Sequence, residues 1–325
     1  MKRLKILILI RNFSAVFPKH KFKTDMVRAI EEFADVRYWT IDGDIERIIK
    51  ALKFKPDFIL HYDIGWSYTY APKIEGLGSC NIPVGCFVND IHNPRYERTS
   101  YFESVKPALI FTTYDKPFKK HFPEYAARQI WWPFGINPNV FKDWHLEKTI
   151  DYLLMGLNFD RSNEKDLRER QMWNSRYPFR EKVLETMRNE DGFIYNRHPG
   201  HFAKSSEKLI VNDKYAKTIN EAKIFFTCGG IDEYAVAKFF EIPACRTLML
   251  AYPNEDVFNL GFEDGVNFVA CSMDDFYEKA QFYKNHDAER QKITDAGYKF
   301  VHENHTNRIR AKQFVQAVTD FLKRM

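Results

Sequence analysis

The sequence has few cysteines and no long hydrophobic run, and both absences narrow the classes of protein it can encode. Its five cysteines are an odd number and form no CxxC pair, so we expect neither a disulfide framework nor a zinc knuckle. A reducing, cytoplasmic setting follows from this expectation. The apolar run Ile6–Ile10 is too short for a signal-peptide core or a membrane span, and it predicts a buried strand instead.

The charge balance and several missing motifs exclude further classes. Lysine and arginine number 49 against 44 acidic residues, and a net charge of +5 allows an anionic partner without requiring a nucleic acid. No GxGxxG follows the first predicted strand and no GxxxxGK[ST] occurs, so dinucleotide and P-loop sites lack their phosphate cradle. The pairs His198/His201 and His302/His305 have no third ligand nearby, and Asp42-Gly43-Asp44 is ordinary turn chemistry, so we expect no metal site.

Short apolar runs alternate with helical patterns along the chain, which is typical of parallel sheets covered by helices. The first half of the pattern predicts strands over Leu4–Ile10, Val36–Thr40, Asp57–His61, Ile82–Val88 and Ala108–Thr113, with helices over Thr24–Phe33 and Ile45–Lys53. The second half predicts strands over Tyr152–Met155, Phe193–Asn196, Ile224–Cys228 and Thr247–Ala251, with helices over Phe179–Arg188, Tyr215–Glu221 and Glu233–Phe240. The expected fold class is α/β, with two Rossmann-like domains.

The aromatic and proline-rich segment 131–141 separates the two halves of this pattern. We therefore expect an N-terminal domain over residues 1–140 and a C-terminal domain over 146–306, followed by an amphipathic helix over 307–325. The apolar face of that helix carries Ala311, Phe314, Val315, Val318, Phe321 and Leu322. We expect it to pack on a core, such as that of the N-terminal domain, although its flanking cations leave peripheral membrane contact as the alternative.

Several motifs in this order resemble the GT-B fold glycosyltransferases, and most closely the CgeB-like, group-one type. The motifs are Asp151-Tyr152-Leu153-Leu154-Met155-Gly156, Tyr177-Pro178-Phe179-Arg180, Arg197-His198-Pro199-Gly200, Tyr215-Ala216-Lys217, Lys238-Phe239-Phe240-Glu241-Ile242-Pro243-Ala244-Cys245, Gly261-Phe262-Glu263-Asp264-Gly265-Val266-Asn267-Phe268 and Glu303-Asn304-His305-Thr306. The resemblance implies two domains that face each other across a cleft. One departure is Arg246, which stands where the family usually has a glycine or another small residue.

The resemblance also implies a donor site in the C-terminal domain. It assigns the ribose hydroxyls to Glu241, since a carboxylate can accept from both hydroxyls of a diol. Glu233 would lie near the transferred sugar or the diphosphate, at the start of a helix that also carries Lys238 and Glu241 and follows the turn Gly229-Gly230. A solvated helix face is the alternative for the two glutamates.

The donor's diphosphate needs positive charge as it leaves, because negative charge develops on its oxygens. Arg161 and Lys165 follow the Gly156 turn and are candidates for that charge, although neighbouring acidic residues also suit an ordinary charged loop. Arg197 and His198 follow a predicted strand end, where open α/β sheets bind ligands, and are further donor candidates.

The acceptor side is expected in the N-terminal domain. Asp90 and His92 follow the strand Ile82–Val88, where they would act as a general base or orient the acceptor, with turn chemistry as the alternative. The basic loop after the first strand suits an acceptor with phosphate or carboxylate groups, or is simply solvated, and three of its cations are the acceptor candidates. They are Arg11, Lys19 and Lys21.

Together these features predict a glycosyltransferase that uses a nucleoside-diphosphate sugar, with a UDP-sugar expected, and that needs neither a cofactor nor a metal. Retention of anomeric configuration is favoured. The expected acceptors are a glycan, a glycoprotein or modified DNA. A sugar-nucleotide epimerase of the same fold and a catalytically silent binding protein for sugar nucleotides or glycans remain the alternatives.

Overall fold

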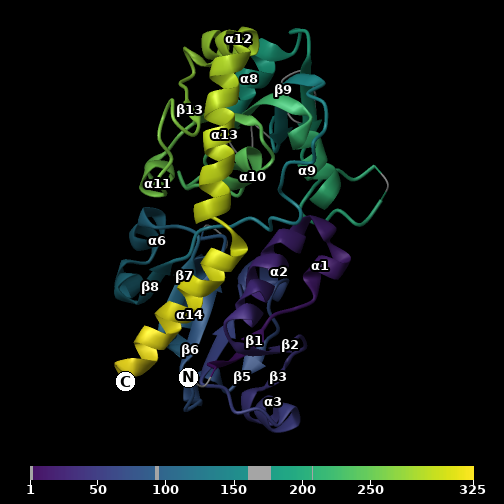
Figure 1. The fold of residues 1–325 in the computed structure, drawn as a ribbon. Helices are drawn as coiled ribbons and strands as arrows, with labels where there is room; N and C mark the ends of the chain where they lie inside the picture. The colour runs from purple at the N-terminus through teal and green to yellow at the C-terminus, as the bar shows by residue number, and fades with distance from the viewer. Residues whose placement is uncertain (1–2, 92–94, 160–176, 207) are drawn as a thin grey trace. The chain divides into compact units, whose positions relative to one another are not determined.

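The computed structural model describes residues 3–91, 95–159, 177–206 and 208–325, and its elements are labelled in Figure 1. The chain divides into two compact units. The first comprises Met1–Pro133 together with Asn307–Met325, and the second comprises Phe134–Thr306. The division therefore falls seven residues before the expected end of the N-terminal domain at residue 140, and the C-terminal helix belongs to the first unit.

A parallel six-stranded sheet forms the centre of the first unit, in the order β2-β1-β4-β6-β7-β8. Its strands are β1 Lys5–Leu9, β2 Asp35–Trp39, β4 Phe58–His61, β6 Val84–Val88, β7 Leu109–Thr112 and β8 Gln129–Trp131. A small second sheet pairs β3 Gly43–Asp44 with β5 Ile74–Glu75. All residues of β4, β6 and β7 are buried, which explains why continuous apolar runs predicted these central strands.

Helices α1 Phe13–Val16, α2 Lys21–Arg28, α3 Ile45–Leu52, α4 Gly65–Tyr68, α5 Arg95–Val105 and α6 Lys116–His121 belong to the same unit. Short 3₁₀ turns occupy Pro18–His20, Ala29–Glu32, Leu77–Ser79 and Pro123–Arg128. Local chemistry sets the ends of α3. The side chain of Asp44 accepts a hydrogen bond from the backbone of Arg47, and Lys53 ends the helix in the left-handed conformation.

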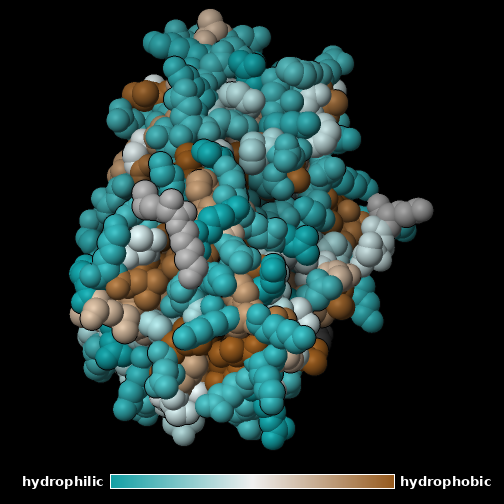
Figure 2. Space-filling model, turned by 60° about the horizontal axis from the view of Figure 1, so that its bottom comes forward, coloured by the Kyte–Doolittle hydropathy of each residue, from teal (hydrophilic) through white to brown (hydrophobic). Residues whose placement is uncertain are grey.

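The C-terminal helix α14, Asn307–Lys323, packs against α2 and the 3₁₀ turn that follows it (Figure 1). Its Phe314 is fully buried, with its ring centre 4.5 Å from that of Phe111 and 5.3 Å from that of Trp132. The apolar face is thus used in the core, as expected. The surface drawn in Figure 2 is mainly hydrophilic, with hydrophobic residues gathered in a few groups. Within the described residues, no helix combines the length and the apolar composition needed to cross a membrane.

The second unit is built on a parallel sheet of order β10-β9-β11-β12-β13. Its strands are β9 Ile150–Gly156, β10 Phe193–Arg197, β11 Ala222–Cys228, β12 Leu248–Tyr252 and β13 Val269–Ala270. Its helices are α8 Pro178–Met187, α9 Asn212–Asn220, α10 Lys238–Ala244, α11 Glu255–Asn259, α12 Phe276–Asn285 and α13 Asp287–Asn304. The two Rossmann-like sheets agree with the expected fold class.

One expected element is wrong in a way that affects the site. The predicted helix Glu233–Phe240 begins only at Lys238, and residues 229–236 form turns and irregular loop. Glu233 has a φ of 52°, in the left-handed region. Glu233 and Glu241 therefore do not share a helix, and Gly229-Gly230 does not lead directly into one.

Candidate functional site

Two cations meet at the carboxyl end of strand β9. A Cβ atom added to Gly156 would lie 3.3 Å from Nη1 of Arg180 and 3.3 Å from Nζ of Lys238. Arg180 comes from the first turn of α8, and Lys238 is the first residue of α10. Gly156 has a φ of +140°, so its backbone conformation and the crowding both favour glycine. A small anion at this position would face two positive charges.

Arg180 is almost completely buried, and its guanidinium is held in place by backbone carbonyls. Nη2 donates to the carbonyl of Cys228 at 3.2 Å, and Nη1 lies 3.5 Å from the carbonyl of Leu157. The guanidinium also stacks over the ring of Tyr177, 4.1 Å from its centre. Its Nε is buried and has no hydrogen-bond partner within the described part of the chain. The guanidinium is thus fixed at the carboxyl end of the sheet.

Lys238 is half-buried, and burial lowers the pKa of its ammonium to about 8. The nearby Arg180 charge lowers that pKa further, whereas Glu241 opposes the shift. Within the described residues, the ammonium makes no hydrogen bond or ion pair. An anionic ligand would therefore relieve the repulsion between the two cations.

Glu241 lies one turn along α10 from Lys238 and is buried, with 7% of its surface exposed. Its Oε2 accepts a hydrogen bond of 3.2 Å from the hydroxyl of Tyr215, on helix α9. Burial raises the pKa of Tyr215 well above its usual value, and the Glu241 carboxylate adds to that shift. Tyr215 thus remains a neutral donor that orients the carboxylate.

The glycines after β11 are required by close packing. A Cβ on Gly229 would approach Nδ2 of Asn254 to 2.3 Å, and a Cβ on Gly230 would come within 2.0 Å of the ring of Tyr234. The N–H of Gly230 donates to the carbonyl of Tyr234 at 3.0 Å, and the N–H of Glu233 donates to the carbonyl of Gly230 at 3.0 Å. The loop therefore uses at least these two N–H groups for internal hydrogen bonds.

Arg197 and His198 also reach the edge around Gly156. Arg197 pairs with Gly156 in the register of β10 and β9, and the N–H of His198 donates to the carbonyl of Gly156 at 3.0 Å. His198 Nδ1 accepts from the N–H of Gly200 at 2.9 Å. The structure therefore brings Gly156, Arg197, His198 and Lys238 to one end of the sheet, and their role as donor-binding residues stays a prediction.

Asp90 lies at the corresponding edge of the first unit, after β6. Its Oδ2 accepts a hydrogen bond of 2.8 Å from the indole N–H of Trp66. The Asp90 carbonyl accepts from Nη2 of Arg98 at 2.8 Å. Asp90 is half-buried. The Asp90 carboxylate is thus oriented by the Trp66 indole, and the Asp90 carbonyl is held by the buried Arg98 guanidinium.

The basic loop of the first unit proves to be engaged in internal contacts. Nε of Arg11 donates to the carbonyls of Tyr68 and Ala71, and its Nη2 pairs with Asp42 at 2.6 Å. Lys21 pairs with Asp25 across one helical turn at 2.6 Å. Lys19 lies in the 3₁₀ turn Pro18–His20 and is half-buried. Two of the three predicted acceptor cations therefore already have carboxylate partners.

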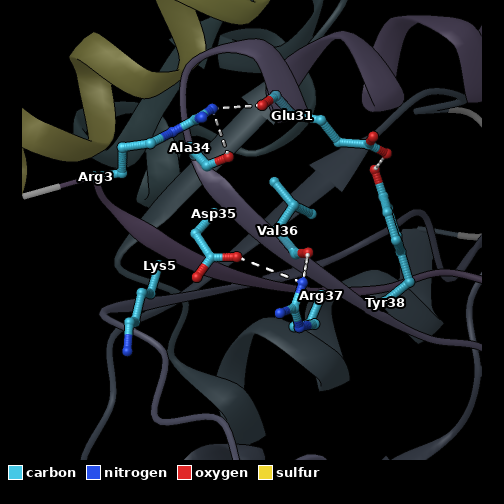
Figure 3. Close-up of a pocket in the computed structure, with 8 residues that line it drawn as sticks. All are labelled: Arg3, Lys5, Glu31, Ala34, Asp35, Val36, Arg37 and Tyr38. Carbon is cyan, nitrogen blue, oxygen red and sulfur yellow. Dashed lines mark hydrogen bonds and ion pairs between the residues drawn. The ribbon is translucent and has the colours of Figure 1, made fainter.

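Among the described residues of the first unit, two open hollows lie apart from these residues. The hollow in Figure 3 measures about 580 Å³, and several of the polar groups that line it are bonded to one another. Arg3 donates to the carbonyls of Glu31 and Ala34, and the hydroxyl of Tyr38 donates to the Glu31 carboxylate at 2.7 Å. The other hollow, about 770 Å³, includes Asp42 and the short sheet residues around it. Neither hollow has the convergent, buried polar groups of a ligand site.

Three predicted site residues, His92, Arg161 and Lys165, lie outside the described residues. Arg180 is a residue of the candidate site that the sequence prediction did not include. The signal was present, because Arg180 stands three, four and seven residues before the buried Val183, Leu184 and Met187, on the core-facing side of α8. A charged residue on an apolar stripe indicates a special environment. Within the described residues, no group of three or more His, Cys, Asp or Glu side chains is arranged to hold a metal ion.

Comparison with known proteins identifies a related protein family and solved structures with a similar fold. Residues 180–316 match a family model described as glycosyl transferase-like. No curated protein matches the chain. A glycosyltransferase from Rickettsia africae ESF-5 is similar in structure, with a TM-score of 0.62 and 11% identity over 100% of both chains.

Two further solved structures have the same fold. HepE from Anabaena, in complex with UDP and glucose, has a TM-score of 0.59 and 8% identity over 98% of this chain and 100% of its own. Sucrose-phosphate synthase from Thermosynechococcus elongatus has a TM-score of 0.58 and 10% identity over 100% of both chains. These similarities confirm the expected fold across the whole chain.

Proposed function

We propose that this chain, a glycosyltransferase of the GT-B fold, transfers a sugar from a UDP-sugar to an acceptor hydroxyl without a metal ion and with retention. The observation that carries the proposal is the meeting of Arg180 and Lys238 at Gly156. A diphosphate placed there would face two cations at the carboxyl end of a parallel sheet, where ligands of such sheets bind.

The cations would stabilise the departing diphosphate, as its oxygens gain negative charge in the transition state. Arg180 is fixed by carbonyls and brings a guanidinium that is always charged, and Lys238 brings a compact ammonium. Together they supply positive charge that a metal ion provides in other enzymes, which supports the metal-independent reaction. Arg197 and His198 border the same edge and would contact the donor from β10.

Glu241 would bind the ribose of the donor. Its carboxylate is oriented by Tyr215 and can accept from two hydroxyls at once. HepE, which has the same fold, was solved with UDP and glucose, and this supports uridine as the nucleoside. Glu233 would contact the transferred sugar from the loop after Gly229-Gly230, and its resemblance to the family's paired glutamates favours retention.

In the retaining reaction, the acceptor oxygen bonds to the anomeric carbon while the bond from that carbon to the diphosphate oxygen breaks. The electron pair goes to the diphosphate, and the hydroxyl proton ends on it. A glycan, a glycoprotein or modified DNA would supply the acceptor hydroxyl. The free cysteines support a cytoplasmic setting for this reaction.

The proposal is tested by UDP binding in Lys238→Met, with Lys182→Met as the matched control on the exposed side of α8. We expect the dissociation constant for UDP, measured by calorimetry, to rise about 10- to 100-fold in Lys238→Met, since a charge-assisted hydrogen bond to phosphate is lost. Lys182→Met should bind like the wild type. Glu241→Gln should also weaken UDP binding, with the exposed Glu278→Gln as its control. Unchanged affinity in Lys238→Met and Glu241→Gln would contradict the donor site.

Turnover separates the proposed reaction from its alternatives. UDP-sugars are incubated with the enzyme, with and without acceptors, and the free UDP and the sugar nucleotides are quantified. Acceptor-dependent release of UDP supports transfer, and the anomeric proton signal of the product reports retention. A new sugar-nucleotide isomer would instead indicate an epimerase, and binding without turnover a silent protein.

A further inference from the structure

We propose that Asp90 and Trp66 form the acceptor subsite, that it takes a hydroxyl of an uncharged sugar, and that Trp66 is the positioning residue that orients the Asp90 carboxylate. This inference rests on the proposed sugar transfer. Three features of the first unit support it. The first is the left-handed backbone around Trp66, and the second is a buried ion pair, Asp63–Arg98, that contacts the loops of both Trp66 and Asp90. The third is that nearby cations already have carboxylate partners.

The backbone that carries Trp66 is strained. Trp66, Ser67 and Tyr68 have φ values of 56°, 52° and 62°, and none of them is glycine. Left-handed residues normally occur singly, because each costs free energy relative to the right-handed conformation. Arg11 holds this segment through the carbonyl of Tyr68 at 2.9 Å. Strain of this kind persists where the surrounding structure imposes it, and it concentrates at functional sites.

The strained segment directs the Trp66 indole to Asp90 at 2.8 Å, and one buried carboxylate fixes both ends of that contact. Asp63 is fully buried. It accepts the N–H of Gly65, which precedes Trp66, at 2.9 Å and the N–H of Asn89, which precedes Asp90, at 3.2 Å. The loops after β4 and β6 are thus joined at the residues next to the pair.

Arg98 completes this support. Its Nη1 pairs with Asp63 at 2.7 Å in a buried ion pair, and its Nη2 donates to the Asp90 carbonyl at 2.8 Å. A Cβ on Gly65 would come within 2.6 Å of Nη2, so glycine is needed for the guanidinium to fit. The position of the Asp90 carboxylate is therefore set by its own backbone and by the indole together, as a preorganised reaction site requires.

Among the described residues, the charges close to this subsite favour an uncharged acceptor. Arg98 is balanced by Asp63, and the buried Lys23 lies 4.5 Å from the centre of the Tyr70 ring and interacts with the charge of Asp90. Arg11 and Lys21 have carboxylate partners, as described above. A phosphate group would be placed beside the Asp90 carboxylate, which would repel it. An uncharged sugar offers hydroxyl donors to a carboxylate and an apolar ring face to an aromatic side chain.

In the retaining reaction, Asp90 would accept a hydrogen bond from the acceptor hydroxyl and hold its oxygen in one orientation. A carboxylate has lone pairs for about four hydrogen bonds, so the hydroxyl adds to the contact with Trp66. The proton ends on the departing diphosphate, and Asp90 remains ionised throughout. Trp66 acts through Asp90 and takes no part in the bond changes.

The test compares Trp66→Phe with the wild type, using a UDP-sugar that the wild type turns over. The acceptors are a panel of uncharged p-nitrophenyl glycosides and, as the charged probe, glucose 6-phosphate. We expect the wild type to use a member of the uncharged panel in preference to the phosphate. In Trp66→Phe, kcat/KM for that acceptor should fall about 10- to 100-fold, as expected for a displaced reacting group, while the dissociation constant for UDP stays unchanged.

Trp144→Phe is the matched control, because it removes an indole donor to the backbone carbonyl of Val140 in the second unit. It should transfer sugar like the wild type. Asp90→Asn should lower transfer at least as much as Trp66→Phe, and adding Trp66→Phe to Asp90→Asn should cause little further loss, because the two residues act as one unit.

Preference for glucose 6-phosphate, no transfer to any uncharged glycoside by an enzyme that binds UDP, or normal transfer by Trp66→Phe would each overturn the inference. Additive losses in the double variant would overturn the coupling of Trp66 to Asp90. Failure of the wild type to bind UDP would instead refute the proposed donor site, so the two failures are distinguishable. Thermal unfolding of each variant shows whether a loss of activity reflects a loss of the fold.

Discussion

At the scale of the residue, Lys238 contributes a titratable positive charge to the proposed donor site. Burial holds the pKa of its ammonium at about 8, so the side chain is mostly charged at pH 7 and mostly neutral at pH 9. We predict that the affinity for UDP falls as pH rises through about 8, by up to about tenfold between pH 7 and pH 9, because the cation is lost. Calorimetry at several pH values measures this change.

Lys238→Met should remove that pH dependence, since methionine does not titrate, whereas the exposed-residue control Lys182→Met should keep it. Binding of a diphosphate itself favours the charged ammonium, so the UDP-bound enzyme should release its proton at higher pH than the free enzyme. A pH-independent affinity in the wild type would show that Lys238 does not contact the phosphates.

The sequence predicted Lys238 and Glu241 as donor-site residues because they stand in a motif with a family resemblance, and their roles remain predictions. It did not predict Arg180 or Trp66. The position of Arg180 beside Gly156 depends on how α8 packs across β9. The orientation of Trp66 depends on a left-handed backbone conformation that a segment without glycine there does not indicate. Both features arise from tertiary contacts, which local sequence patterns do not encode.

At the scale of the element, the turn between α10 and β12 explains the unusual Arg246. This residue has a φ of 53°, in the left-handed region where the family's small residue would be favoured. Its guanidinium pairs with Asp143 at 3.2 Å and with Asp295 on α13. The ion pairs thus join three segments of the second unit and offset the cost of the backbone conformation.

We predict that Arg246→Ala is less stable than Arg246→Gly by about 1 kcal/mol, because alanine retains the left-handed strain and glycine does not. Both variants lose the ion pairs, so the difference between them isolates the backbone effect. Chemical denaturation, read as the free energy of unfolding, measures it. Equal stabilities of the two variants would show that the turn relaxes when the arginine is removed.

The prediction of elements from the sequence succeeded for strands that are buried on both faces. It failed for a segment that was predicted to be helical and forms an irregular loop. The central residues of both strands are apolar, Tyr152–Met155 in β9 and Ile224–Phe226 in β11, and both strands were predicted to within two residues at each end. Glu233, Ala235 and Ala237 favour a helix, but the packing of Gly229 against Asn254 and of Gly230 against Tyr234 holds this segment in an irregular loop. Tertiary contacts overrode the local propensity there.

At the scale of the whole molecule, the first unit is discontinuous in sequence. The chain leaves it at Pro133, forms the second unit, and returns at Asn307 to complete the first with α14. The sequence pattern showed the apolar face of this helix, but only the structure shows that Phe58, Phe111 and Trp132 surround Phe314. Stability of the first unit therefore depends on the last residues of the chain.

We predict that Phe314→Ala destabilises the first unit by about 3–5 kcal/mol, the usual cost of removing a fully buried phenylalanine side chain. Hydrogen exchange should show lost protection in β1, β4 and β7, while β9 and β11 keep theirs, because Phe314 packs only within the first unit's core in the contacts described. Lys312→Ala, on the exposed side of α14, should leave exchange unchanged in both units. UDP affinity should also survive in Phe314→Ala, since the proposed donor residues all belong to the second unit. Equal loss of protection in both units would contradict their division and show that they unfold as one.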